Sequence, residues 1–241
     1  MALRGAASSV TRVRSTPRGR AGFDPLPHST LDRPVGLGGA PLIGVLALQG
    51  DFEAHGRMLS ALSAEVREVR TPADLDGLEG LVIPGGESTT MTLGIEREGL
   101  AGPLRSLAAA GTPILGSCAG LIMLDREHLG LMDIRAERNA FGRQLRSFEA
   151  DIELRGIDGD PAHPDPAHPD ASRPLRAVFI RAPWIAEHGP GVKILAEVDG
   201  HPVAARERNM LAVAFHTELG EDDRLHRMLL AGVARSSVSQ P

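Results

Sequence analysis

The chain of 241 residues is 42% hydrophobic and contains 28 glycines, which is enough to fill the core of one sizeable α/β domain without requiring a second. Its single cysteine excludes an intramolecular disulfide framework and favours a reducing cytoplasm. The formal net charge of −5 gives no reason to expect a nucleic-acid partner. No apolar run approaches the roughly 20 residues that cross a bilayer, so we predict a cytoplasmic protein with no membrane association.

The first 40 residues differ in composition from the rest of the chain. Six arginines stand among Ser, Pro and Gly without any apolar periodicity, and against two aspartates they give this stretch a net charge of +4. We therefore expect residues 1–40 to form a disordered basic arm. Contact with RNA or an acidic partner, a transit-like role, and a translation start downstream of Met1 are the alternatives for it.

Strands and helices alternate from Pro41 onward. Apolar runs predict strands at residues 42–48, 66–69 and 81–84, and helical spacing predicts helices at 51–62, 91–96 and 103–110. This alternation is typical of a doubly wound sheet, in which sites form beyond the carboxyl ends of the parallel strands. The turn Gly85-Gly86 follows one of these ends directly.

The next predicted strand and helix meet at the only cysteine. A short apolar strand at residues 113–115 is followed by Gly116-Ser-Cys-Ala-Gly120 and by a helix at 119–125. Small residues on both sides of Cys118 indicate a nucleophile elbow, a strained strand-to-helix turn that exposes the side chain at its apex. The partial positive charge of the helix N-terminus favours a thiolate there. The alternative is a buried structural cysteine that behaves as a small hydrophobe.

Shorter strands follow the elbow. We expect them at residues 133–137, 148–154, 177–180, 192–197, 203–207 and 211–215, several of them antiparallel, with a closing helix at 222–234. Between residues 158 and 174 the unit Pro-Ala-His-Pro-Asp occurs twice, and its prolines predict a surface insertion without regular structure. Metal binding by His163 and His168 is the alternative for this insertion. The domain is expected to span residues 41–235, with a disordered tail at 236–241.

A thiolate nucleophile needs a base and a group that orients the base. His216 follows an apolar strand, and Glu218 stands two residues later, where it can return to the imidazole ring and stabilise its protonated form. An ordinary surface histidine is the alternative. Four other histidines are less suitable bases because of their positions: His55 in an early helix, His163 and His168 in the insertion, and His28 in the arm.

The Gly85-Gly86 turn supplies the third requirement of acyl transfer, backbone N–H groups that stabilise an oxyanion. Two glycines also permit a peptide flip that side chains would hinder. A plain strand-to-helix turn is the alternative. A site is favoured because this turn, Cys118 and His216 all fall at strand ends of one predicted sheet.

These residues carry a family resemblance. Gly116-Ser-Cys-Ala-Gly120 together with the late His-x-Glu resembles the class I glutamine amidotransferases, which release ammonia from glutamine. Five motifs resemble, more narrowly, the glutaminase subunits of pyridoxal 5′-phosphate synthase: Leu48-Gln-Gly50, Pro84–Met91, Glu137–Gln144, Ser147–Ala150 and Phe179–Pro183. The resemblance covers residues 41–235. It implies a single-domain, flavodoxin-like α/β fold with a mostly parallel sheet, helices on both faces and added antiparallel strands.

The resemblance also implies a role for each matching residue. Cys118 would be the nucleophile that forms a γ-glutamyl thioester, His216 the general base and then acid, and Glu218 its orienting partner. The glutamine-binding and oxyanion positions would be Gly85, Gly86, Glu87, Arg138, Ile180 and Arg181. Arginine offers a planar fork for the α-carboxylate of the substrate, and an ordinary salt bridge is the alternative for Arg138 and Arg181. Acyl transfer by these groups requires no metal and no organic cofactor.

By the same resemblance, the substrate is L-glutamine, and the ammonia passes to a partner, the synthase subunit that builds pyridoxal 5′-phosphate. Two other hypotheses stay open: a glutaminase subunit of another amidotransferase, and a catalytically silent binding subunit of the synthase. The chain departs from the family pattern at Thr217, where proline is usual, and at Trp184, where a smaller or more polar residue is expected. Neither departure removes a catalytic group.

Overall fold

The computed structural model describes residues 39–138, 147–155 and 173–238. These residues belong to the second of two units in the chain, Gly38–Pro241. The arm up to residue 38, the repeated Pro-Ala-His-Pro unit and the last three residues lie outside the described ranges, so the predictions for them stay predictions. Within those ranges, no helix has both the length and the apolar character needed to cross a membrane.

A seven-stranded sheet forms the centre of this unit, in the order β2-β1-β3-β4-β11-β10-β9. Its first five strands run parallel: β2 (Glu65–Val69), β1 (Leu42–Leu46), β3 (Gly80–Ile83), β4 (Ile114–Ser117) and β11 (Met210–Val213). The antiparallel strands β10 (His201–Glu207) and β9 (Lys193–Val198) extend it. Every residue of β3, β4 and β11 is buried, because the sheet is covered on both faces. The predicted mostly parallel sheet with added antiparallel strands is confirmed.

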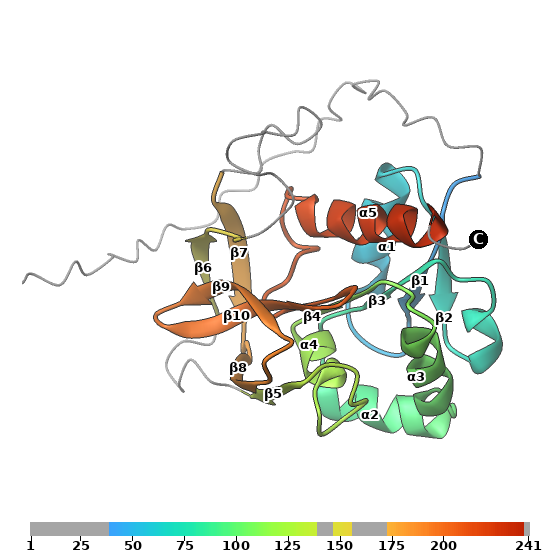
Figure 1. The fold of residues 1–241 in the computed structure, drawn as a ribbon, viewed down its shortest axis with the longest axis horizontal. Coiled ribbons are helices and arrows are strands. Elements are labelled where there is room, and N and C mark those ends of the chain that lie inside the picture. The colour runs from blue at the N-terminus through green and yellow to red at the C-terminus, as the bar shows by residue number, and fades with distance from the viewer. Residues whose placement is uncertain (1–38, 139–146, 156–172, 239–241) are drawn as a thin grey trace, which may run out of the picture. The chain divides into compact units, whose positions relative to one another are not determined.

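Helices lie on both faces of this sheet, as the fold prediction requires (Figure 1). One face carries α1 (Phe52–Ala61) and α5 (Arg224–Val238). The other carries α2 (Ser88–Arg97), α3 (Ala101–Ala109) and α4 (Ala119–Leu124). The helix α5 continues to Val238 instead of ending at residue 234, so the first residues of the predicted tail are helical.

Two small antiparallel sheets accompany the large one. In one, β6 (Ser147–Ile152) pairs with β7 (Leu175–Ile180), and in the other β5 (Ile134–Glu137) pairs with β8 (Trp184–His188). The apolar pattern does not predict β8, because its last three residues are all exposed and neither alternate nor form an apolar run. Trp184 stacks on His201 of β10 with ring centroids 3.6 Å apart, which gives this unexpected residue a packing role. The 3₁₀ helix at Pro72–Leu75 is a second element without an apolar signal.

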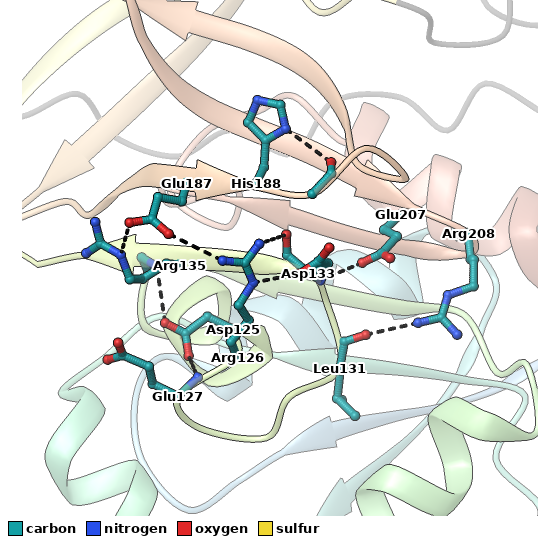
Figure 2. A network of polar contacts seen from close by, with 12 residues as sticks. Asp125, Arg126, Glu127, Leu131, Asp133, Arg135, Glu187, His188, Glu207 and Arg208 are labelled. Atoms are coloured by element: carbon teal, nitrogen blue, oxygen red, sulfur yellow. Dashed lines mark hydrogen bonds and ion pairs between the residues drawn. The ribbon is translucent and has the colours of Figure 1, made fainter.

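A polar network ties the β5–β8 ribbon to the end of α4 (Figure 2). The carboxylate of Asp125, at the C-terminal cap of α4, is almost completely buried and accepts a hydrogen bond from the Ala136 backbone N–H at 3.2 Å. Across the ribbon, Arg135 Nε lies 2.9 Å from Glu187 Oε1. These contacts hold in place the ribbon whose end carries Arg138.

Candidate active site

Cys118 lies at the turn between β4 and α4. Its φ of 49° and ψ of −102° are strained values for a residue with a side chain, and its backbone N–H donates to the Val213 carbonyl at 2.8 Å. A Cβ on Gly120 would collide with the Ile83 carbonyl oxygen, and one on Gly116 would lie 2.7 Å from the Gly120 carbonyl group. Strand and helix approach this closely only through glycine. The predicted strained strand-to-helix turn is confirmed.

His216 and Glu218 come together beside Cys118. His216 Nδ1 lies 2.7 Å from Glu218 Oε1, and the His216 backbone N–H donates to the Val178 carbonyl at 2.9 Å. A Cβ on Gly85 would lie 2.6 Å from His216 Cε1 and 3.3 Å from the Cβ of Cys118. The backbone of Gly85 therefore borders both side chains, and the three elements that the sequence placed at strand ends do meet.

Burial and hydrogen bonding shift the pKa values of His216 and Glu218 in opposite directions. Burial alone would lower the pKa of His216, but hydrogen bonds and charge interactions with Cys118 and Glu218 raise it to about 10. Burial alone would raise the pKa of Glu218, but hydrogen bonding to His216 and His55 holds it well below its usual range. These shifts favour a protonated His216 ring beside an ionised Glu218, and a neighbouring imidazolium stabilises a thiolate.

The segment Gly85-Gly86-Glu87 joins β3 to α2. Glu87 is the N-cap of α2, and its carboxylate accepts hydrogen bonds from the backbone N–H groups of Thr90 at 2.7 Å and Thr89 at 3.1 Å. These bonds lower the pKa of Glu87 to about 2. The carboxylate of Glu87 is therefore engaged by the N-terminus of its own helix.

Gln49, for which sequence reasoning finds no role, attaches this segment to the end of β1. Its Oε1 accepts a hydrogen bond from the Glu87 backbone N–H at 2.5 Å. A Cβ on Gly86 would collide with the same oxygen, and a Cβ on Gly50 would collide with the carbonyl oxygen of Gly85. The two loops thus pack through their glycines, which explains why Leu48-Gln-Gly50 and the Gly85-Gly86 turn occur together.

The other three candidate contacts come from separate parts of the chain. Arg138 Nη1 donates to Thr89 Oγ1 at 3.3 Å, which places its guanidinium beside the first turn of α2. The Ile180 carbonyl oxygen lies 3.9 Å from Cys118 Sγ, and Arg181 follows with a left-handed φ of 46° and an exposed side chain. The antiparallel pairing of β5 with β8 brings Arg138 and Arg181 to the same end of one ribbon.

Sequence reasoning overlooks a further polar group that contacts Glu218. His55 lies in a helix as expected, but it is fully buried, and its Nε2 is 3.2 Å from Glu218 Oε2. Its Nδ1 is 2.9 Å from Nε2 of His226 on α5. The signal lies in the helical spacing, because Phe52, His55 and Leu59 share the apolar face of α1. A histidine on such a face needs a buried polar partner.

Thr217 stands between the histidine and the glutamate, and its Oγ1 is buried with no hydrogen-bond partner among the described residues. A buried hydroxyl without a partner costs about 1–3 kcal/mol. We expect Thr217→Val, which is nearly isosteric, to raise the free energy of unfolding by about 1 kcal/mol in urea titrations. Thr217→Ser keeps the hydroxyl and serves as the control without this gain. A valine variant no more stable than the wild type would show that the hydroxyl is satisfied.

The fold and this arrangement define a class of protein. An α/β sheet presents a cysteine on a strained elbow, next to a histidine–carboxylate pair from a later strand, which is the arrangement of enzymes that transfer acyl groups through a thiol. The sequence profile of the SNO glutamine amidotransferase family matches residues 45–234, and the chain belongs to this family.

Individual relatives support the same assignment. Pyridoxal 5′-phosphate synthase subunit PdxT of Mycolicibacterium vanbaalenii is 46% identical over 207 residues, which cover 81% of this chain and 99% of the relative. The protein of the same name from Geobacillus kaustophilus is 47% identical over 204 residues, 82% of this chain and 97% of its own length. The family resemblance that the five motifs carry is confirmed.

Solved structures agree with the fold. The crystal structure of a glutamine amidotransferase aligns with a TM-score of 0.70 at 39% identity, covering 80% of this chain and 98% of its own. The structure of PurLQS from Thermotoga maritima aligns with a TM-score of 0.61 at 16% identity, covering 83% and 98%. The second likeness concerns the fold alone. The predicted class I glutamine amidotransferase-like architecture is confirmed.

Proposed function

We propose that this chain is the glutaminase subunit of a pyridoxal 5′-phosphate synthase, hydrolysing L-glutamine to L-glutamate and ammonia and passing the ammonia to a synthase subunit. One observation carries the proposal: Cys118 meets the His216–Glu218 pair at one edge of the sheet. In addition, nearly half of the aligned residues are identical to those of relatives that bear the name of a subunit of that synthase.

The proposed reaction passes through a covalent intermediate. The Cys118 thiolate attacks the γ-carboxamide carbon of glutamine, and His216 gives a proton to the nitrogen, which leaves as ammonia from a γ-glutamyl thioester. His216 then takes a proton from water, whose oxygen attacks the thioester and releases glutamate and the thiolate. Because Glu218 holds Nδ1 of the ring at 2.7 Å, Nε2 is the nitrogen left to exchange these protons.

Two backbone N–H groups near the cysteine are the candidate donors for the oxyanion of both steps. The N–H groups of Ala119 and Gly86 donate to no acceptor among the described residues. Ala119 follows the nucleophile, the position that supplies an oxyanion donor in nucleophile elbows. The next N–H along, that of Glu87, already donates to Gln49. We assign the oxyanion site to Ala119 and Gly86, and the α-carboxylate of glutamine to Arg138 and Arg181.

A partner is supported by the surface next to the site. Two large hydrophobic side chains stand out as exposed among the described residues, Leu93 at 61% and Leu219 at 47%. Leu93 lies in the second turn of α2, and Leu219 follows Glu218 directly. Leu219 thus adjoins Glu218, and Leu93 lies on the helix that Glu87 caps, and we assign both side chains to contact with the synthase subunit. A reactive thiol that must stay reduced supports a cytoplasmic location.

Docking also explains how ammonia release is controlled. We expect the isolated subunit to be weakly active, because the Gly85-Gly86 peptide completes the oxyanion site only when the synthase subunit binds. Two adjacent glycines give this peptide the freedom to reorient. A free subunit that turns over glutamine as fast as the complex would refute this control.

The test uses glutamine labelled with ¹⁵N in its amide group. Glutamate release is measured with and without the purified synthase subunit, and the label in pyridoxal 5′-phosphate is measured with unlabelled ammonium in excess. The proposal expects faster glutamate release with the partner and labelled product despite the ammonium. Release that ignores this partner would indicate another amidotransferase, and no release under any condition would indicate a silent binding subunit.

A further inference from the structure

Two histidines that the proposed reaction does not use lie in the core next to the triad. His55 on α1 and His226 on α5 are both fully buried, and their ring centroids are 5.1 Å apart. The two helices lie on the same face of the sheet (Figure 1). Polar rings in a core need hydrogen-bond partners, and the identity of these partners suggests what the pair does.

The partners of His55 lead directly to the triad. Its Nε2 lies 3.2 Å from Glu218 Oε2 and equally far from Ser117 Oγ, while its Nδ1 lies 2.9 Å from His226 Nε2. His216 already occupies the other carboxylate oxygen, Oε1. Glu218 Oε2 makes no hydrogen bond of good geometry with any group among the described residues, and its contact with His55 Nε2 is a short approach of 3.2 Å. One imidazole therefore lies next to each oxygen of this buried carboxylate.

The available donors and acceptors indicate which nitrogen of each ring carries the proton. Nε2 of His55 faces both the Glu218 carboxylate and the Ser117 hydroxyl, and because a carboxylate accepts more strongly, we place the proton of His55 on Nε2. With the proton of His55 on Nε2, its Nδ1 accepts from Nε2–H of His226. His226 Nδ1 has no partner among the described residues, and burial lowers the pKa of His226 to about 3. His226 is thus a neutral ring that donates through Nε2.

We propose that His55 is a positioning residue for the glutaminase reaction, holding Glu218 so that its other oxygen faces His216, and that His226 sets the tautomer of His55. The chain of contacts runs from His226 through His55, Glu218 and His216 to Cys118. The catalytic role of this chain rests on the proposed function. Its titratable groups are these five residues, with Ser117 as the neutral neighbour of His55.

The test compares His55→Leu with His55→Gln. Leucine removes the donor to Glu218, while the amide of glutamine places an N–H near the position of Nε2 and should rescue. For His55→Leu we expect kcat to fall about tenfold or more, as for the loss of other groups that orient a catalytic histidine, with an unchanged KM for glutamine. His55→Gln is expected to keep most of the wild-type kcat. Equal losses in both variants would overturn the positioning role.

A second readout does not depend on glutamine. Because Cys118 is the only cysteine, iodoacetamide reports on this thiol alone, and its rate against pH follows the thiolate. Without His55, Glu218 is no longer held facing His216 and stabilises the imidazolium less, so His55→Leu should move the midpoint to higher pH by about half a unit or more. His128→Leu, which breaks a partly buried histidine–carboxylate pair, is the control expected to lose stability without this shift.

The histidine tautomers can be tested in the unmodified protein. In ¹⁵N-labelled chain we expect His226 to be neutral and protonated at Nε2 between pH 5 and pH 8, by the side-chain nitrogen shifts. A proton on Nδ1 of His226, or an alkylation midpoint in His55→Leu equal to that of the wild type, would overturn the inference. A wild type that releases no glutamate would refute the proposed function, while alkylation would still decide whether His55 positions Glu218.

Discussion

Cys118→Ala is expected to abolish glutamate release, lowering kcat by a factor of about 10⁴ or more, because the nucleophile of a triad cannot be replaced by the remaining groups. No second thiol exists in the chain to take over. Alanine removes only Sγ from a side chain that is 6% exposed, so the elbow and its packing should survive. The measurement is single-turnover release of glutamate with the synthase subunit present.

Binding provides the control for this variant. Calorimetry should show that Cys118→Ala still binds L-glutamine and the synthase subunit, since neither Arg138 nor the exposed leucines are altered. Loss of rate with binding retained assigns the chemistry to the thiol. A variant with more than about a hundredth of the wild-type kcat would contradict the thioester mechanism.

Gly85→Ala is expected to lower kcat by a factor of about 10² without removing any catalytic group. The new Cβ would lie 2.6 Å from Cε1 and 2.9 Å from Nδ1 of His216. The ring has little room to yield, because Glu218 holds its Nδ1 at 2.7 Å and its backbone is bonded to Val178. A misplacement of the base by a fraction of an ångström is enough for such a loss.

Gly102→Ala is the matched control for this substitution. Gly102 lies in α3, and a Cβ there would meet nothing within 4 Å. This variant should keep the wild-type kcat and gain about 0.5–1 kcal/mol of stability, as a helical glycine replaced by alanine does. If Gly85→Ala also kept the wild-type rate, Gly85 would not border a catalytic histidine in the active state.

The parallel core could be predicted because its strands are covered on both faces. Such strands appear in the sequence as continuous apolar runs, and residues 42–48 and 81–84 are of this kind. The strand β8 could not be predicted in the same way. Three of its five residues are exposed, and its order depends on pairing with β5, which is distant in the sequence.

In the candidate site, too, some residues could be placed from the sequence and others could not. Cys118 and His216 could be placed at one edge of the sheet, since each follows a strand and the carboxyl ends of parallel strands meet there. The carboxylate of Glu87 could not be placed, because whether it faces a substrate or caps its own helix depends on the backbone at that turn. In the structure it caps α2.

By itself, the sequence determined the family and the elbow and indicated the residues of the proposed triad, because residue types over a few positions are enough to specify a strained turn and a base two residues from its orienting group. Only the tertiary structure decided which buried groups lie next to Glu218. His55 and His226 are 171 residues apart in the chain, and they meet because α1 and α5 pack on one face of the sheet. Once they are buried there, unpaired polar atoms are costly, so each proton must have a defined place.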